Sequence, residues 1–197
     1  MEIMSEQNNE VATLVEKAKT GNRNSLEKLI DLYHQDVFRM VYYRTRSKMD
    51  AEDLTQEIFI KMVNSLSGLK DSNRFRAWLF KMTLNRIRDF HRKKNILAFF
   101  GTSKEIEAIN PGAQNSESPL SKLEEREFEE RLHEYTSRLS RWERETFLLR
   151  FVDQLGIREI AEVMNRNENT VKTHLYRALK KMKQDLKFRK LLAGENL

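Results

Sequence analysis

The sequence predicts an all-α protein with two small helical domains joined by a flexible linker, and three observations lead to this fold. Charged residues make up 34% of the 197 residues, and glycine and proline are few, which is typical of helices with solvated faces. Apolar side chains recur at spacings of three and four in both halves of the chain. Both prolines, Pro111 and Pro119, lie in one polar stretch that no helix should cross. We expect domains over residues 1–96 and 121–197 and a linker over 97–120.

The apolar periodicity of the first domain predicts four helices. The first ends at Gly21, and the second spans residues 25–46. The third starts at Asp50, a good N-cap, with Asp53 in a box-like position three residues later. The fourth begins near Asn73. The side chains expected to be buried are, helix by helix, Val11, Leu14, Val15 and Ala18; Leu26, Leu29, Ile30, Tyr33, Val37, Phe38 and Val41; Leu54, Ile58, Phe59, Met62 and Leu66; and Phe75, Trp78, Leu79, Met82 and Phe90.

The second domain is predicted to hold a helix near residues 121–136 and another that begins at Ser140, where Ser-Arg-Trp-Glu forms a capping box. Residues 157–181 then have the form of a helix-turn-helix, with Asn167 as the N-cap of its second helix. The inward residues of these two helices are Ile157, Ile160, Ala161 and Met164, then Val171, Leu175, Ala178, Leu179 and Met182.

The second helix of this motif carries a basic and polar face. The side chains on that face are Lys172, Thr173, His174, Tyr176, Arg177, Lys180 and Lys181. An exposed helix with such side chains suits the DNA major groove, where they can reach base edges and phosphates. The alternative is a solvated basic helix packed on a helical core.

Charge is segregated along the chain. The net charge is +6 and the pI is near 9.5, which favours a polyanionic partner but does not separate nucleic acid from an anionic membrane surface. Nine Lys or Arg stand against two Asp in residues 70–94, nine against two acids in 164–190, and three against eight Glu in 101–130. Two tethered basic surfaces predict two contacts along one polyanion; the alternative is two unrelated solvated faces.

Several classes of function are excluded or disfavoured. The chain has no cysteine, which excludes disulfides, thiolate zinc sites and cysteine nucleophiles. Its four histidines are scattered without metal-ligand spacing, and it has neither a phosphate-cradling glycine loop nor a nucleophile elbow. We therefore expect no enzymatic activity and no cofactor. The polar N-terminus and the lack of a long apolar run predict a soluble cytoplasmic protein without membrane insertion.

The predicted third helix has an acidic and amide-bearing face formed by Asp53, Gln56, Glu57 and Ile60, at positions i, i+3, i+4 and i+7. This face could dock on a basic protein surface. Acids near a helix N-terminus also suit the helix dipole, and the residues alone favour that simpler interpretation.

The predicted fourth helix has a basic face formed by Lys81, Asn85, Arg88 and Arg92. Other cations widen it, and Trp78, Phe80 and Phe90 are interleaved with them. Cations beside aromatic rings are what a single-stranded DNA site needs. The alternative is an apolar core stripe, to which we assign Trp78, with merely solvated cations. The polar loop over residues 65–74 could accept an extruded base, although an ordinary helix connection is its default interpretation.

Three segments in order resemble a bacterial RNA polymerase sigma factor of the extracytoplasmic-function (ECF) group. They read DAEDLTQEIFIKMVNSL over residues 50–66, FRAWLFKMTLNRIRDFHRKK over 75–94 and IREIAEVMNRNENTVKTHLYRALKK over 157–181. The opening AKTGNRNSLEKLIDLYHQDVFRMV is also similar to the start of that family's first domain. The resemblance covers nearly the whole chain outside the linker.

The resemblance implies site residues and partners that spacing does not. One set, Asp50, Asp53, Gln56, Glu57 and Phe59, would bind the clamp helices of the polymerase largest subunit, which reverses the preference for the dipole interpretation. A second set would capture a flipped base of the minus-ten element or contact the opened strand: Ser67, Lys70, Asp71, Asn73, Asn85, Arg88 and Arg92. A third set would read the minus-thirty-five element: Lys172, Thr173, Tyr176, Arg177 and Lys180.

The resemblance also implies partners for the rest of the chain. The linker would thread toward the polymerase active-site cleft, the second domain would meet the flap region of the polymerase, and an anti-sigma protein would act as repressor. Lys172 and His174 stand where family members vary, so the target sequence cannot be carried over.

Two rival functions remain open. An ordinary helix-turn-helix regulator would use the first domain for dimerisation or sensing and would bind duplex DNA tightly without polymerase. A helical adaptor would hold proteins or anionic membrane on its basic faces and would show no sequence-dependent DNA binding. The polar face over residues 50–61 disfavours a sensor pocket, and the face around Lys172 and Arg177 lacks the wide apolar side of a membrane helix.

Overall fold

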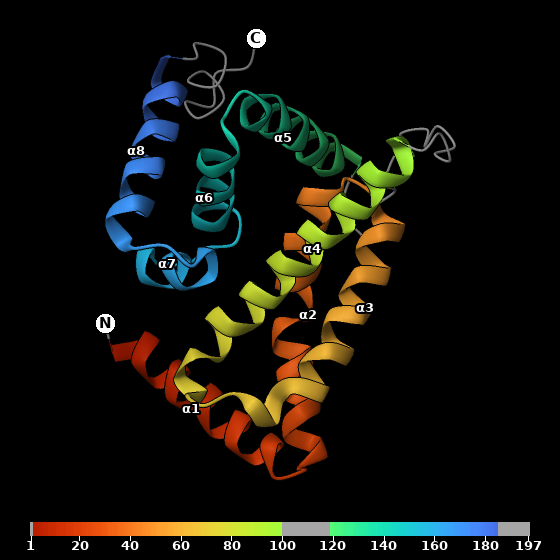
Figure 1. Ribbon diagram of the computed structural model, residues 1–197, viewed down its shortest axis with the longest axis vertical. Coiled ribbons are helices and arrows are strands. Elements are labelled where there is room, and N and C mark those ends of the chain that lie inside the picture. Colours follow the sequence, from red (N-terminus) through yellow and green to blue (C-terminus); the bar gives the residue numbers. More distant parts are fainter. Residues whose placement is uncertain (1, 100–118, 185–197) are drawn as a thin grey trace. The chain divides into compact units, whose positions relative to one another are not determined.

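A computed structural model describes residues 2–99 and 119–184 of the chain. Nearly all of these residues lie in helices. Side chains are described for residues 9–96 and 127–184. These parts contain α-helices and short 3-10 turns and no strand (Figure 1), which confirms the all-α fold class. The chain separates into two compact units, one holding α1 to α4 and the other holding α5, α6, α8 and most of α7.

The first unit consists of α1 (Glu2–Lys19), α2 (Arg23–Thr45), α3 (Lys48–Ser65) and α4 (Phe75–Phe99). Helix α2 packs against each of the other three, and α3 also packs against α4. Two 3-10 turns, η1 (Leu66–Gly68) and η2 (Ser72–Arg74), connect α3 to α4, and both contact α1. The fully buried side chains at the centre of this unit include Val15, Leu29, Met40, Ile58, Met62, Phe75, Leu79, Phe80 and Leu84.

The start of α3 differs from the prediction. Its N-cap is Ser47, whose hydroxyl accepts a hydrogen bond from the Asp50 amide at 3.2 Å. Arg46, in the left-handed conformation at φ 59°, ends α2 one residue earlier. Ser47 is therefore the first residue with extended backbone after α2, and Asp50 lies inside the first turn of α3. The proposed box between Asp50 and Asp53 is wrong for this reason.

The other helix starts of the first unit are also set by local capping. Asn22 caps α2 by accepting from the Ser25 amide at 2.9 Å, so the helix begins at Arg23 rather than at residue 25. Asn73, expected near the start of the fourth helix, lies in η2, and α4 begins at Phe75. Asp71 caps η2 by accepting from the Asn73 amide at 3.1 Å.

The second unit consists of α5 (Pro119–Ser137), α6 (Arg141–Phe151), α7 (Ile157–Met164) and α8 (Glu168–Gln184). The capping box of Ser140 and Glu143 at the start of α6 is confirmed. Asn167 accepts a hydrogen bond from the Thr170 amide at 2.7 Å, which confirms it as the cap of α8. Between α7 and α8, Asn165 adopts φ 52°, and the Arg166 amide bonds to a carbonyl of α7 at 2.9 Å, so the turn is tight.

The two helices that flank the predicted linker both extend into its range of residues 97–120. Helix α4 continues to Phe99 and α5 begins at Pro119, a residue whose fixed φ and missing N–H suit the first position of a helix. The remainder, residues 100–118, lies outside the described residues, as does any path it takes toward a polymerase cleft. Among the helices described, none combines the length and the apolar character needed to span a bilayer.

Candidate nucleic-acid and polymerase interfaces

Helix α8 divides into a buried side and an exposed side, as the helix-turn-helix motif requires. Val171 and Ala178 are fully buried, while Tyr176 is 67% exposed. The predicted reading residues Lys172, Thr173, Tyr176, Arg177 and Lys180 are all exposed. Lys172 lies 3.8 Å from Glu168 one turn earlier, whereas neither Arg177 nor Lys180 has an ion-pair partner in the described part of the chain. His174, placed on the same face by the sequence, is half-buried.

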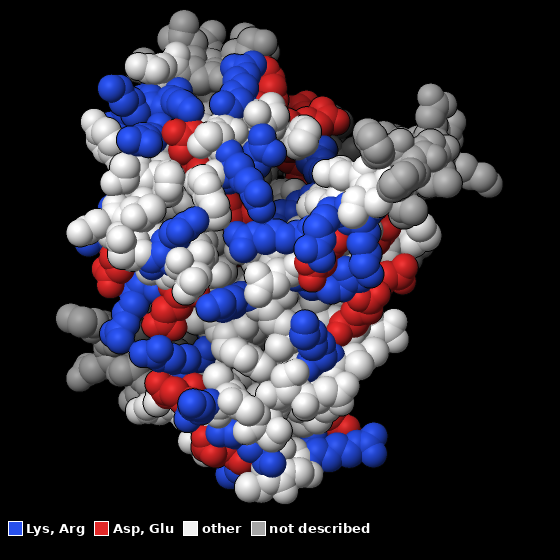
Figure 2. All heavy atoms as spheres, viewed as in Figure 1, with Lys and Arg blue, Asp and Glu red and all other residues white. Residues whose placement is uncertain are grey.

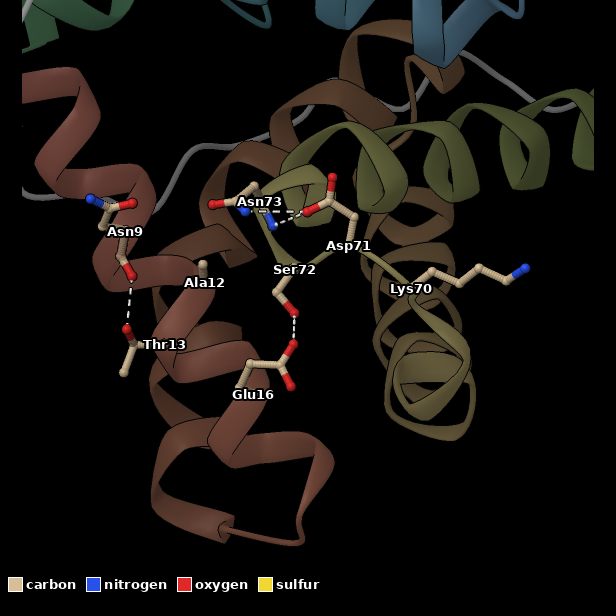
Figure 3. A pocket seen from close by; sticks show the side chains of 8 residues that line it. All are labelled: Asn9, Ala12, Thr13, Glu16, Lys70, Asp71, Ser72 and Asn73. Atoms are coloured by element: carbon tan, nitrogen blue, oxygen red, sulfur yellow. Dashed lines mark hydrogen bonds between the residues drawn. The ribbon is translucent and has the colours of Figure 1, made fainter.

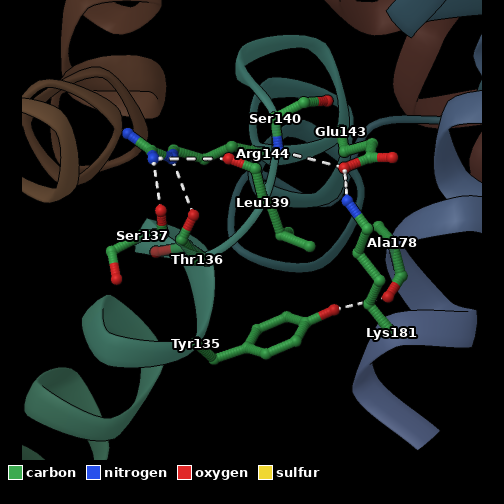
Figure 4. Close-up of polar contacts among 9 residues, drawn as sticks. All are labelled: Tyr135, Thr136, Ser137, Leu139, Ser140, Glu143, Arg144, Ala178 and Lys181. Atoms are coloured by element: carbon green, nitrogen blue, oxygen red, sulfur yellow. Dashed lines mark hydrogen bonds and ion pairs between the residues drawn. The ribbon is translucent and has the colours of Figure 1, made fainter. Parts of the chain in front are cut away.

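Three side chains link α5, α6 and α8 to one another: Tyr135 joins α5 to α8, Lys181 joins α8 to α6, and Arg144 joins α6 to α5 (Figure 4). The Tyr135 hydroxyl donates to the Ala178 carbonyl at 2.5 Å, and Lys181 Nζ lies 2.6 Å from Glu143 Oε2. The Arg144 guanidinium donates to the Thr136 carbonyl at 2.7 Å and to the next carbonyl at 3.0 Å, satisfying groups at the end of α5. The recognition helix is thus anchored through its buried side, which leaves the opposite side free for a ligand.

Glu143 has an altered acidity because of these contacts. Burial by itself would raise its pKa, but hydrogen bonds from Lys181 and from Ser140 outweigh that effect and hold the pKa below the usual value of 4.5. The side chain is only 7% exposed, and it serves both the α6 cap and the α8 anchor. A charged Glu143 therefore links the two helices.

A pair of arginines flanks Trp142 at the helix-turn-helix. The Arg166 guanidinium carbon lies 4.8 Å from the Trp142 ring centroid, and that of Arg141 lies 5.6 Å away. Arg166 immediately precedes the α8 cap and is exposed. The predictions missed both Arg166 and Trp142, because Trp142 reaches the turn from α6 and only the fold brings them together. Stacking restricts the guanidinium before any phosphate is bound.

The docking face predicted on α3 is exposed in the structure. Asp53, Gln56 and Glu57 are exposed, and beside them Ile60 is 56% and Val63 39% exposed. Glu57 Oε2 lies 2.5 Å from the Arg86 guanidinium of α4, so this carboxylate is partly neutralised. An acidic and amide face with an apolar edge is the composition expected of a protein-docking surface.

Two residues assigned to that face lie elsewhere. Phe59 is 6% exposed and stacks on His34 at a centroid distance of 5.9 Å, so it belongs to the core and we remove it from the docking face. Asp50 is 21% exposed and lies 4.0 Å from Lys94, at the border of the acidic face with the basic end of α4.

Lys and Arg side chains gather over α4 on the face shown in Figure 2. Asn85 and Arg92 are exposed, and Lys81 and Arg88 are half-buried. Arg92 pairs with Asp89 at 3.2 Å. The aromatic part of the prediction is wrong for Phe80, which is fully buried with the Arg76 guanidinium 5.3 Å from its ring. Phe90 is half-buried, and Lys94 Nζ lies 5.6 Å from its ring centroid.

The loop between α3 and α4 borders a pocket of about 590 Å³. Lys70, Asp71 and Asn73 line it together with residues of α1, whereas Ser67 is exposed in η1 and does not line it (Figure 3). The Ser72 hydroxyl donates a short hydrogen bond to Glu16 of α1. This bond, followed by one from Lys19, lowers the pKa of Glu16. The loop is therefore held to α1 by a charged carboxylate.

Comparison with known proteins assigns both units. The family model described as Sigma-70 region 2 matches residues 29–96, and that described as Sigma-70, region 4 matches residues 129–182. The first covers most of α2, all of α3 and most of α4, and the second covers the C-terminal part of α5, all of α6 and α7, and most of α8. The faces described above thus lie within the two matched regions, except where α1 borders the pocket.

Two proteins of similar sequence are also RNA polymerase sigma factors. The chain is 30% identical over 170 residues to the RNA polymerase sigma factor SigV of Bacillus subtilis, covering 86% of this chain and 96% of that protein. It is 31% identical over 168 residues to the ECF RNA polymerase sigma factor BldN of Streptomyces coelicolor, covering 85% of this chain and 62% of that longer protein.

Solved structures share the fold. One is CnrH in complex with the cytosolic domain of CnrY, with a TM-score of 0.66 at 21% identity, covering 94% of this chain and 99% of that one. Another is the sigma factor RpoE in complex with the anti-sigma factor NepR from Bartonella quintana, with a TM-score of 0.60 at 19% identity, covering 80% and 94%. The sequence matches and the shared fold together show that this chain belongs to the sigma-70 family, as an RNA polymerase sigma factor of the ECF group.

Proposed function

We propose that this sigma factor contacts the transcription machinery and its promoter through three surfaces. The docking face on α3, formed by Asp53, Gln56, Glu57, Ile60 and Val63, binds the clamp helices of core polymerase. The loop after α3 and the basic face of α4 bind the minus-ten element. The exposed side of α8 reads the minus-thirty-five element as duplex DNA.

The main observation that supports this proposal is that α8 has one buried side and one exposed side. Val171 and Ala178 are fully buried on one side of the helix. Five polar or basic side chains are exposed on the other: Lys172, Thr173, Tyr176, Arg177 and Lys180. Arg177 and Lys180 have no ion-pair partner in the described part of the chain. Cations that are not neutralised within the protein can pair with phosphates or with guanine in the major groove.

Promoter opening is proposed to use binding energy alone. An extruded base enters the pocket beside Asn73 while Asn85, Arg88 and Arg92 hold the opened strand. The cost of unstacking a base is a few kcal/mol, and contacts made only to the opened strand offset it. No catalytic step by this chain is needed, in keeping with its sigma-factor relatives.

We further propose that residues 1–96 and 121–197 act as separate binding domains on a tether, with the second domain also meeting the flap region of polymerase in the cytoplasm. One solved structure of this fold is a complex of the sigma factor RpoE with the anti-sigma factor NepR, and another is a complex of CnrH with the cytosolic domain of CnrY. A comparable anti-sigma protein is therefore the proposed repressor of this chain.

The docking face can be tested with a pair of matched double variants. Asp53→Ala with Gln56→Ala removes two exposed side chains from α3, and Asp31→Ala with Gln35→Ala removes the same exposed residue types from α2. Affinity for core polymerase is measured by pull-down and anisotropy. The α3 variant should bind at least about tenfold more weakly, which corresponds to about 1.4 kcal/mol lost over the two side chains together, and the α2 variant should bind normally. Equal affinity of the two would remove α3 as the docking face.

Promoter recognition itself is tested by in vitro transcription with purified core enzyme and a library of promoters. The chain should start transcription at templates that share two spaced sequence elements. An ordinary helix-turn-helix regulator would instead bind duplex DNA without changing the start sites that core enzyme uses, and a helical adaptor would show no sequence preference.

A further inference from the structure

The pocket beside the minus-ten loop has a second wall that comes from α1. Asn9, Ala12, Thr13 and Glu16 form this wall, and residues 70–73 form the other (Figure 3). The volume of about 590 Å³ lies within the range of roughly 300–1,000 Å³ found for small-ligand sites. The cavity can therefore hold one planar base between the loop and α1.

Most polar groups on the loop side are already engaged. Asp71 Oδ1 accepts from the backbone amide and the side-chain amide of Asn73, at 3.1 and 3.2 Å, and Asp71 Oδ2 lies 3.3 Å from Arg74 Nε. The Ser72 hydroxyl donates a hydrogen bond to Glu16. Asp71 and Ser72 thus shape the turn. Among the loop side chains, the Asn73 carbonyl oxygen, the second N–H of the Asn73 amide and the Lys70 ammonium are left for a ligand.

The α1 wall supplies the groups that the loop lacks. The side-chain amide of Asn9 has no partner among the described residues, and it lies across the pocket from Asn73 (Figure 3). An amide offers one donor and one acceptor side by side, which suits two hydrogen bonds to a base edge. Glu16 meets Ser72 and Lys19 through Oε1, so its second oxygen remains an acceptor at the pocket.

We propose that α1 completes the base-capture pocket: Asn9 reads the edge of the extruded base, and Glu16 is a positioning residue that holds the η2 turn through Ser72. This rests on the proposed capture of a base by residues 65–74. Donors and acceptors are both free at the pocket, on the amides of Asn9 and Asn73, the second oxygen of Glu16 and the Lys70 ammonium. The pocket can therefore distinguish bases by the pattern of donors and acceptors on their edges.

The test uses holoenzyme assembled from the full chain and core polymerase. Fork promoter DNA is single-stranded over the minus-ten element, and each non-template position carries each of the four bases in turn. Affinity is measured by fluorescence anisotropy. Wild type should prefer one of the four bases at one position of the element. Asn9→Ala should lower that preference at least about fivefold, the lower end of the discrimination given by a bidentate contact. The matched control, Asn24→Ala at an exposed position on α2, should keep it.

Glu16 is tested by a conservative pair of variants. Glu16→Ala removes the acceptor for Ser72 and should reduce the preference at the same position, whereas Glu16→Gln keeps an acceptor oxygen and should restore it. A purely structural role would change thermal melting and affinity for every sequence alike, without changing the preference between bases. Melting followed by circular dichroism accompanies each variant.

These variants distinguish a failure of the α1 proposal from a failure of the proposed base capture. If Asn73→Ala abolishes the preference while Asn9→Ala and Glu16→Ala leave it intact, the loop captures the base and α1 takes no part. If all three variants leave the preference intact, the proposed base capture fails and this inference fails with it. A wild type that shows no preference between bases at any position would overturn the proposed reading of a base edge by Asn9.

Discussion

Lys181 Nζ lies 2.6 Å from Glu143 Oε2, and the same carboxylate oxygen accepts the Ser140 amide at 3.0 Å. One buried carboxylate therefore joins the recognition helix α8 to the cap of α6. The position of the DNA-reading face depends on this contact, because α8 packs directly on α6.

Lys181→Ala should destabilise the second unit by about 1–2 kcal/mol, since it removes a hydrogen bond to a charged group that stays nearly buried. Lys183→Ala, an exposed lysine in the same last turn, is the matched control and should have almost no effect. Both are measured by urea unfolding in a Trp78→Phe background, where the remaining Trp142 reports on the second unit alone. Equal midpoints for the two lysine variants would show that the ion pair contributes nothing.

The stability of the second unit should depend on the ionisation of Glu143. Its pKa in the folded state is lowered below 4.5, so the stabilisation is fully present above the unfolded pKa and is lost as pH falls through the folded value. In the same fluorescence assay, the stability difference between wild type and Glu143→Gln should be constant above pH 4.5 and shrink below it. A difference that persists unchanged in acid contradicts the assignment.

Arg166 is expected to contact a DNA phosphate from its place against Trp142. Arg166→Ala should weaken binding on all promoter sequences about equally and reduce the slope of log affinity against log salt by about 0.9, the value for one phosphate contact. Trp142→Leu should reproduce a two- to fivefold part of this loss, corresponding to an exposed cation–π contact of about 0.5–1 kcal/mol. If the salt slope of Arg166→Ala equals that of wild type, Arg166 is not a phosphate ligand.

Arg177→Ala should behave differently, because it lies on the exposed side of α8 rather than at the turn. If it reads a base, the variant loses about 1–3 kcal/mol of discrimination at one position of the minus-thirty-five element and little elsewhere. The measurement is holoenzyme affinity for a set of single-base promoter variants. A uniform loss across that set would make Arg177 a phosphate contact instead.

Phe80 and Phe90 provide a paired test of the α4 surface. Phe80 is fully buried, so Phe80→Ala should cost about 3–5 kcal/mol of stability in the first unit. Phe90→Ala should cost far less stability but weaken binding of single-stranded minus-ten DNA, by about 1–3 kcal/mol if a base stacks on the ring. The first is followed by urea unfolding of Trp78 fluorescence in a Trp142→Phe background, the second by anisotropy. If Phe90→Ala binds the DNA with normal affinity, no base stacks on this ring and the cations of α4 alone hold the opened strand.

Local rules made much of this protein predictable. The capping box of Ser140 and Glu143 and the cap at Asn167 depend on residues within three positions of each other, so the sequence contains them complete. The apolar stripes of α3 and α8 follow the helical period, and residues such as Ile58 and Val171 are buried as expected. Caps and apolar stripes of this local kind occur in both regions that the family models match.

Other features were decided by tertiary structure. Ser47 and Asp50 are both good caps, and the left-handed Arg46 selects Ser47 because it ends α2 just before it. Phe80 is buried because α2 and α3 both pack against α4, which covers more of that helix than one apolar stripe.

The helices, the capped starts of α6 and α8 and the basic face of α8 follow from the sequence alone, because each depends on neighbours one or two turns away. The fold alone decided the contact of Glu16 with Ser72, which are 56 positions apart, and the stacking of Arg166 on Trp142. Such contacts depend on how helices pack, and no periodicity along the chain encodes which side chains of two distant segments will meet.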